Sequence, residues 1–117
     1  MNHRYEKLTV WQKSMDLVEV IYCVTQKFPL NEQYGLSAQM RRCAVSIPSN
    51  IAEGSRRNSN KDFHHFVTMA FGSGAELETQ LHISRRLHYI EEVDFQNTIR
   101  QITEVMKMIN KFRSGLK

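Results

Sequence analysis

The chain has 117 residues, of which 41% are hydrophobic, and this length supports one compact domain with a modest core. Sixteen Lys and Arg residues outnumber twelve Asp and Glu residues, and the net charge of +4 favours polyanionic partners without requiring them. No apolar run approaches the roughly 18 residues of a membrane span and the first residues lack a signal peptide, so we expect a cytoplasmic protein with no membrane partner.

Four stretches with helical periodicity follow one another, separated by short breaker clusters, and no strand-like alternation competes with them. They predict helices at residues 7–27, 32–54, 60–88 and 93–113. Because the connections are short, consecutive helices should be antiparallel. The sequence therefore predicts an all-α fold, an antiparallel up-down-up-down four-helix bundle that forms a single domain over residues 1–117.

The first predicted helix carries two apolar lines instead of one. Leu8, Trp11, Met15, Val18 and Tyr22 form one line, and Val10, Leu17, Ile21, Val24 and Phe28 form the other. Together they span about 200°, against about 100° or somewhat more for a helix with a single buried side. One bundle core cannot cover both lines, so this excess of apolar surface indicates self-association.

The second predicted helix repeats the arrangement. Its core line consists of Leu36, Met40, Cys43, Ile47 and Ile51, and its opposite line of Tyr34, Ala38, Val45 and Ala52. The expected oligomer interface combines residues of both helices: Tyr34, Ala38, Val45, Ala52, Leu17, Ile21 and Val24. The alternative is a helix surrounded by neighbours, which is difficult in a four-helix bundle because every helix there touches solvent.

Pro48 falls inside the second helical stretch, where a proline removes one backbone hydrogen bond and costs about 3 kcal/mol or more. Both apolar lines nevertheless continue through Pro48 in phase. The pattern therefore predicts one helix that is kinked at Pro48. Ser46, Ser49 and Asn50 cluster at the kink, where their side chains can bond the carbonyl of Ala44 that the proline leaves free.

The third predicted helix begins after Ser59, a capping residue that is followed by Asp62 at the third helical position. Gly54 stands where the second helix is expected to stop. Gly74 lies on the buried line of the third helix, and a helical glycine costs about 1 kcal/mol relative to alanine unless close packing compensates. We therefore expect a tight helix crossing at Gly74. The fourth predicted helix has one apolar stripe within residues 95–112 and needs only the bundle core.

Three segments of the chain resemble a bacterial family of four-helix bundle proteins encoded in intervening sequences of 23S ribosomal RNA genes: LTVWQKSMDLVEVIY, YGLSAQMRRCAVSIPSNIAEGSRRNS and FGSGAELETQL. The family is often labelled S23 ribosomal protein, and the resemblance covers nearly the whole chain. Related accessory proteins of diversity-generating retroelements assemble as basic pentameric barrels, bind nucleic acid and engage a reverse transcriptase. The resemblance thus implies a homo-oligomer, a pentamer by analogy, but it transfers no functional residue from those relatives.

The sequence favours a non-enzymatic oligomeric module that binds RNA or DNA through phosphate contacts, without sequence specificity. Arginine fits phosphate bidentately, and neither a base-reading helix nor an aromatic platform for single strands is recognisable. The candidate nucleic-acid-binding residues are Arg41, Arg42, Arg56, Arg57, Arg85, Arg86, Arg100, Lys107 and Lys111. In the competing interpretation these residues are solvated or pair with Glu53, Glu76 and Glu78 of a neighbouring subunit.

Two other functions stay open. The first is a protein-interaction scaffold for a nucleic-acid enzyme such as a reverse transcriptase. The second is a small helical ribonuclease, because Arg57 and His64 have the Arg-x6-His spacing in which histidine serves as acid or base on RNA. Glu78 and His82 share a helix face, but no paired Glu-x-x-His set accompanies them, so we predict no catalytic residue, no metal site and no cofactor.

Overall fold

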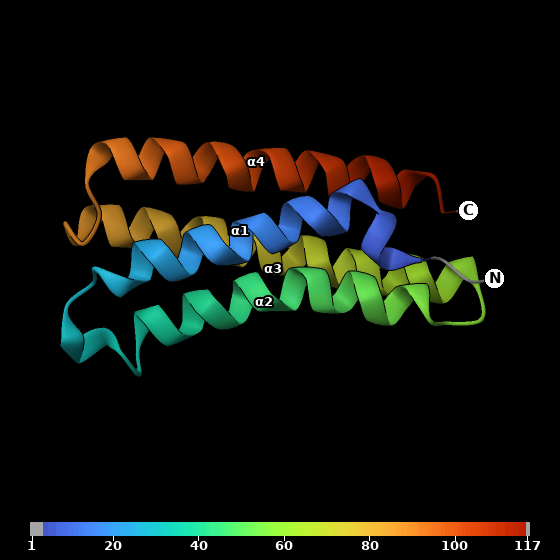
Figure 1. The fold of residues 1–117 in the computed structure, drawn as a ribbon, viewed down its shortest axis with the longest axis horizontal. Helices are drawn as coiled ribbons and strands as arrows, with labels where there is room; N and C mark the ends of the chain where they lie inside the picture. Colours follow the sequence, from blue (N-terminus) through green and yellow to red (C-terminus); the bar gives the residue numbers. More distant parts are fainter. Residues whose placement is uncertain (1–3, 117) are drawn as a thin grey trace.

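Four long helices run alternately up and down in the computed structural model, which describes residues 4–116 (Figure 1). They are α1 (Thr9–Gln26), α2 (Leu36–Ser55), α3 (Asn60–Arg86) and α4 (Glu92–Ser114). Two short 3-10 helices accompany them: η1 (Tyr5–Lys7) precedes α1, and η2 (Leu30–Glu32) lies between α1 and α2. The described residues contain no strand. The predicted all-α antiparallel bundle is confirmed, and every helix begins and ends within four residues of its expected bounds.

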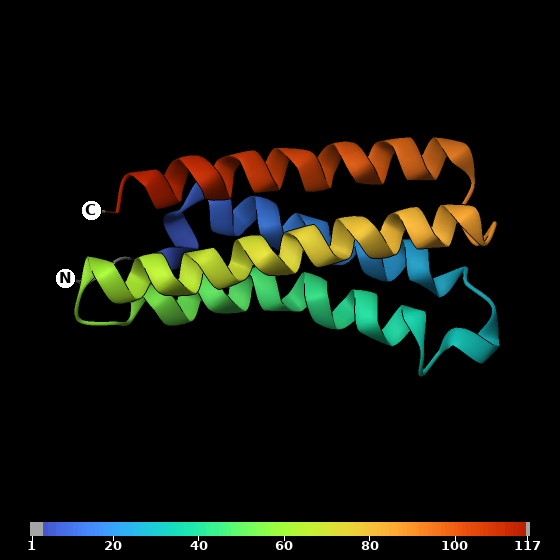
Figure 2. The ribbon, with the colours of Figure 1, turned by 180° about the vertical axis from the view of Figure 1, so that it is seen from behind.

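Helices that are consecutive in the chain are neighbours in space, and contact between α1 and α4 closes the bundle. The interface of α2 with α3 is the most extensive of the four. The first and last described residues lie at the same end of the bundle as the α2–α3 turn, as both ribbon views show (Figures 1 and 2). We call this the α2–α3 end, and we call the opposite end, where α3 connects to α4, the α3–α4 end.

The core takes one apolar line from each helix. Its most completely buried side chains are Leu17 and Ile21 of α1, Met40, Ile47 and Ile51 of α2, Phe63, Val67, Leu77 and Leu81 of α3, and Ile102, Val105 and Ile109 of α4. For α2 this is the core line that the sequence predicts. Since α1 turns its Leu17 line inward, its other line, which includes Trp11 and Met15, faces outward.

The second helix continues through Pro48 without a break, as the sequence predicts, and its ribbon bends along its length (Figure 2). The side-chain amide of Asn50 donates hydrogen bonds to the carbonyl and the hydroxyl of Ser46, at 2.8 and 3.0 Å. The carbonyl engaged is thus that of Ser46 and not that of Ala44. The Ser46 hydroxyl also lies 2.7 Å from that of Ser73 on α3, so the polar cluster beside the proline joins the two helices.

Two glycines mark close helix crossings. A Cβ added at Gly54 would lie 2.7 Å from Cβ of Phe66 and 2.8 Å from Cδ1 of Phe63, both on α3. A Cβ added at Gly74 would lie 3.0 Å from Cγ of Met106 on α4, which confirms the crossing expected there. Because α2 runs one residue past Gly54, this glycine serves the packing of α3 and does not mark the end of α2.

The substitution Gly54→Ala should lower the free energy of unfolding by about 1–3 kcal/mol, because its methyl group overlaps the Phe63 ring and Cβ of Phe66 on α3. Helix propensity alone would favour alanine by roughly 0.5–1 kcal/mol. Gly72→Ala is the matched control, since nothing lies within 4 Å of a Cβ added at that exposed position of α3. Urea unfolding should show the control stabilised, and equal effects of the two substitutions would contradict the crossing.

Helix α2 begins four residues later than expected because Glu32 caps it from η2. The Glu32 carboxylate accepts hydrogen bonds from the backbone N–H of Leu36 at 3.0 Å and from the Tyr89 hydroxyl at 2.8 Å. These donors, the backbone N–H first, favour the ionised form and lower the pKa of Glu32 from its ordinary value. Tyr89 also packs on Phe28, with ring centroids 5.5 Å apart, so the two connections at the α3–α4 end are held together.

The pKa of Glu32 predicts an acid-sensitive contribution to stability. Since the folded pKa is lower than the unfolded one, the contribution is complete above the unfolded pKa and is lost as pH falls through the folded pKa. Glu32→Gln should therefore lose less stability than the wild type when urea unfolding is measured from about pH 7 down to about pH 3. Tyr89→Phe removes one of the two donors, so its loss of stability over this pH range should be intermediate between those of the wild type and Glu32→Gln. Superimposable pH profiles for Glu32→Gln and the wild type would refute this role.

Candidate functional site

An apolar groove runs along the outside of the bundle between α1 and α2. Its walls are Tyr5, Trp11, Met15 and Val18 on one side and Val45, Pro48, Ser49 and Ala52 on the other, and we call these residues the outer groove. Met15 and Val45 keep 37% and 40% of their surface exposed although both lie in the interior of long helices. The Tyr5 ring packs on Trp11 with centroids 5.4 Å apart, so η1 forms part of this surface. The second apolar lines of both helices thus face water in the single chain.

The predicted oligomer interface is wrong for two residues of α1. Leu17 and Ile21 are 1% and 0% exposed in the bundle's own core, so they cannot contact another chain. Trp11 and Met15, from the other apolar line, occupy the outer position instead. The reason is that periodicity gives the angle between two lines of a helix but not which of them faces the core. Val24 is half-buried and lies in a separate groove, between α1 and α4.

The four remaining residues of the predicted interface are accessible. Val45 and Ala52 line the outer groove, and Ala38 is half-buried further along the same line of α2. Tyr34 is 90% exposed, but it lies in the connection before α2, next to the capping residue Gly35. On α2 the outer groove therefore includes Val45 and Ala52 but not Ala38, which Arg41 and Arg42 separate from Val45 along the helix, while Tyr34 stands apart from the helix.

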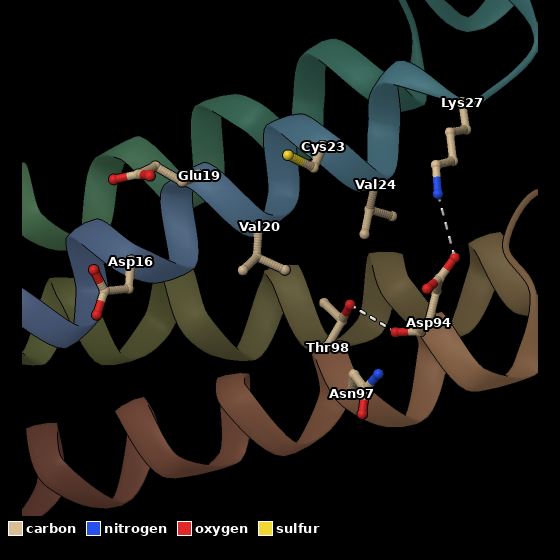
Figure 3. A pocket seen from close by; sticks show the side chains of 9 residues that line it. All are labelled: Asp16, Glu19, Val20, Cys23, Val24, Lys27, Asp94, Asn97 and Thr98. Atoms are coloured by element: carbon tan, nitrogen blue, oxygen red, sulfur yellow. Dashed lines mark hydrogen bonds and ion pairs between the residues drawn. The ribbon is translucent and has the colours of Figure 1, made fainter.

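The groove between α1 and α4 has a different chemical character (Figure 3). Its lining residues are Asp16, Glu19, Val20, Cys23, Val24 and Lys27 of α1 with Asp94, Asn97 and Thr98 of α4. Lys27 Nζ pairs with Asp94 at 3.7 Å, and the Thr98 hydroxyl donates to the Asp94 carbonyl at 2.7 Å. Three carboxylates face a single lysine, so this groove repels a phosphate.

Arg41 and Arg42 point to opposite sides of α2. Nε of Arg41 donates to the Thr25 hydroxyl at 2.8 Å, and its guanidinium lies 4.6 Å from the ring centroid of Tyr22, so Arg41 binds α1. Arg42 is exposed and lines a polar groove between α2 and α3 together with Glu76. The side chains of these two adjacent arginines therefore lie on different surfaces of the bundle.

Two further candidates pair with acidic residues of their own chain. Arg57 bonds Glu53 at 2.7 Å, and Arg85 donates two hydrogen bonds to the Glu92 carboxylate at 3.0 and 2.7 Å. The pKa of Glu92 is lowered by the side-chain hydrogen bond from Gln96 and by Arg85. Glu53 therefore already has a partner without a neighbouring subunit.

The nine candidate phosphate contacts do not form one patch. Arg41, Arg42, Arg85 and Arg86 lie toward the α3–α4 end, whereas Arg56, Arg57, Lys107 and Lys111 lie toward the α2–α3 end, with Arg100 near the middle of α4. Arg56, Arg86, Arg100, Lys107 and Lys111 are exposed. The basic residues therefore offer two separate surfaces to a polyanion.

Catalytic groups are sparse in the described part of the chain. Arg57 and His64 are both exposed at the α2–α3 end, but the guanidinium of Arg57 is directed to Glu53 and lies 4.6 Å from the ring centroid of Phe66. Burial and the nearby Glu76 raise the pKa of the Cys43 thiol to about 11, so little thiolate forms at neutral pH. Within residues 4–116, no cluster of His, Cys, Asp and Glu could hold a metal ion, and no helix is long and apolar enough to cross a membrane.

The comparison with known families settles the resemblance seen in the sequence. The family model for the 23S rRNA-intervening sequence protein matches residues 6–111. This chain belongs to that family. A crystal structure of a protein of unknown function from the S23 ribosomal protein family of Bacteroides thetaiotaomicron has 27% sequence identity and a TM-score of 0.81, over 89% of this chain and 97% of that one. No curated protein matches the chain.

This member of the intervening-sequence family also carries exposed or half-buried groups that the sequence did not single out. Tyr5 joins the outer groove through η1, and Lys61 and Arg113 lie at the α2–α3 end. Lys61 and Arg113 could have been found from the sequence, because each lies within one or two turns of a helix end. In an up-down-up-down bundle, the start of α3 and the end of α4 meet at the same end of the molecule, so their charges add.

Proposed function

We propose that this chain is a non-enzymatic module that assembles with copies of itself and binds RNA or DNA through phosphate contacts, without reading sequence. The observation that carries the proposal is the outer groove, where large apolar side chains of two helices face water. The net positive charge and the exposed basic side chains support a polyanionic partner. The pentamer is the assembly that the family resemblance suggests.

A second copy of the chain is the partner that best suits the outer groove. Most soluble assemblies of one chain are symmetric, and interfaces between identical subunits are more apolar than the rest of the protein surface. Burying apolar area stabilises association by about 25 cal/mol for each Å² removed from water. Met15, Val45 and Trp11 are the side chains that would contribute most, because they are large and incompletely covered.

The substitution Val45→Glu should release folded monomers, because an unpaired carboxylate in a buried interface costs several kcal/mol. The matched control is Val93→Glu, which places the same charge on a valine that is 64% exposed in the first turn of α4. Light scattering at micromolar concentration should give one mass for the wild type and Val93→Glu, and a mass of one chain for Val45→Glu. A wild type that is already monomeric would contradict the proposal.

Phosphate contacts would be weak for one copy and strong for the assembly. A chain with net charge +4 neutralises few phosphates, but linked copies raise the effective concentration of every further contact. Each neutralised phosphate releases counterions, so affinity falls with salt concentration at a slope set by the number of contacts. The described residues provide no base-reading element, which agrees with binding that tolerates changes of sequence.

Binding to a mixed-sequence DNA duplex should fall steeply with salt and should change little when the sequence is permuted. His64→Ala should leave this binding intact and should change no cleavage rate. If the wild type instead cuts RNA and His64→Ala abolishes cutting while binding persists, the ribonuclease alternative is correct. If neither DNA nor RNA binds at low salt, the protein-interaction scaffold is the better description. Filter binding and a gel assay of RNA integrity distinguish these outcomes.

A further inference from the structure

The positive charge of the chain is concentrated at one end of the bundle. Dividing each helix at its middle assigns residues 4–17, 46–72 and 104–116 to the α2–α3 end, and this half contains nine basic and five acidic residues. The other half, residues 18–45 and 73–103, contains six basic and seven acidic residues. The whole net positive charge of the described residues therefore belongs to the α2–α3 end.

Ion pairs leave the net charge of each half unchanged, but they leave fewer unpaired basic side chains at the α3–α4 end. At the α3–α4 end, Arg85 is neutralised by two hydrogen bonds to Glu92, and Lys27 pairs with Asp94. Among the described residues of the α2–α3 end, Arg57 and Glu53 form the one ion pair. Most basic side chains at the α2–α3 end thus have no ion pair with a carboxylate of the described residues.

Aromatic rings, and not carboxylates, hold two of the guanidinium groups at the α2–α3 end. The guanidinium carbon of Arg56 lies 5.5 Å from the ring centroid of Tyr5, and that of Arg113 lies 4.7 Å from that of Phe71. Arg113 also donates to the side-chain oxygen of Asn110 at 2.7 Å and to the Thr68 hydroxyl of α3 at 3.4 Å. A guanidinium stacked on a ring still presents N–H donors at its edge, so it remains able to bind a phosphate.

We infer that the phosphate backbone of RNA or DNA docks on the α2–α3 end, through Arg56, Lys61, Lys111 and Arg113. This inference rests on the proposed function and places its contacts on one surface. The molecule is 45 Å long, whereas charges in physiological salt are screened over about 8 Å, so the two ends act independently on a polyanion. In a cyclic assembly whose axis runs along the bundles, the α2–α3 ends of all copies lie at the same height and form one basic rim.

The test compares two triple variants with the same change of charge. Arg56→Gln, Lys61→Gln and Lys111→Gln remove three charges from the α2–α3 end, and Arg42→Gln, Arg86→Gln and Arg100→Gln remove three from the other half. All six side chains are exposed, and none has an ion pair with an acidic residue among the described residues. The probes are a DNA duplex of mixed sequence and an RNA duplex of the same sequence. Circular dichroism and light scattering check that both variants keep the fold and the mass of the wild type.

The first variant should have a smaller slope of log affinity against log salt concentration. The decrease should equal the contribution of about three phosphate contacts for each subunit that touches the duplex. With one subunit on the duplex, its loss of affinity between about 50 and about 200 mM salt should be about 40-fold smaller than that of the wild type. The second variant should keep the slope of the wild type. If the second variant loses as much slope as the first, the inference is overturned while nucleic-acid binding stands. If the wild type binds neither duplex at low salt, the proposed function and the inference fail together.

Discussion

A helix in a four-helix bundle can turn only one side to the shared core, and both α1 and α2 carry apolar residues on two sides. The core takes the line of Leu17 on α1 and the line of Ile47 on α2. The second apolar lines of the two helices remain outside the core and form the outer groove, whose walls include Trp11, Met15 and Val45. The position of this groove follows from the way α1 and α2 pack, since the two outer lines become adjacent only because the helices are neighbours.

The shape of α2 serves both of its apolar sides. Pro48 lacks a backbone donor, and the side-chain bonds beside it engage Ser46 and not the Ala44 carbonyl that the proline leaves free. These bonds, from Asn50 to Ser46 and between Ser46 and Ser73, tie this part of α2 to α3. The Pro48 ring itself is buried and forms part of the wall of the outer groove. Close packing at Gly54 fixes the same helix against α3 near its end. The segment that reads SIPSNIAEG thus combines a core line, a polar bond to α3 and an apolar outer wall.

Much of this fold follows from local rules that can be applied to the sequence. Ser59 accepts a hydrogen bond from the backbone N–H of Asp62 at 3.1 Å, as its capping position predicts, and Gly74 lies at a close crossing. The orientation of α1 could not be predicted, because the angle between its two lines is local whereas the direction of the core depends on the other helices. The hydrogen bond between Tyr89 and Glu32 could not be predicted either, since it joins residues 57 positions apart in the chain.

The two proposed surfaces lie on different parts of the molecule, with the groove along the side and the basic residues at the α2–α3 end. Binding of a polyanion depends on assembly through the groove, because each chain is only weakly basic and an assembly carries several copies of the charged end. Trp11 is the chain's single tryptophan and lies in the groove, so its fluorescence reports directly on whether the groove is covered. Quenching by acrylamide should be weak in the wild type and clearly stronger in Val45→Glu at the same concentration. Equal quenching of the two proteins would show that the groove stays open to water and would contradict the account.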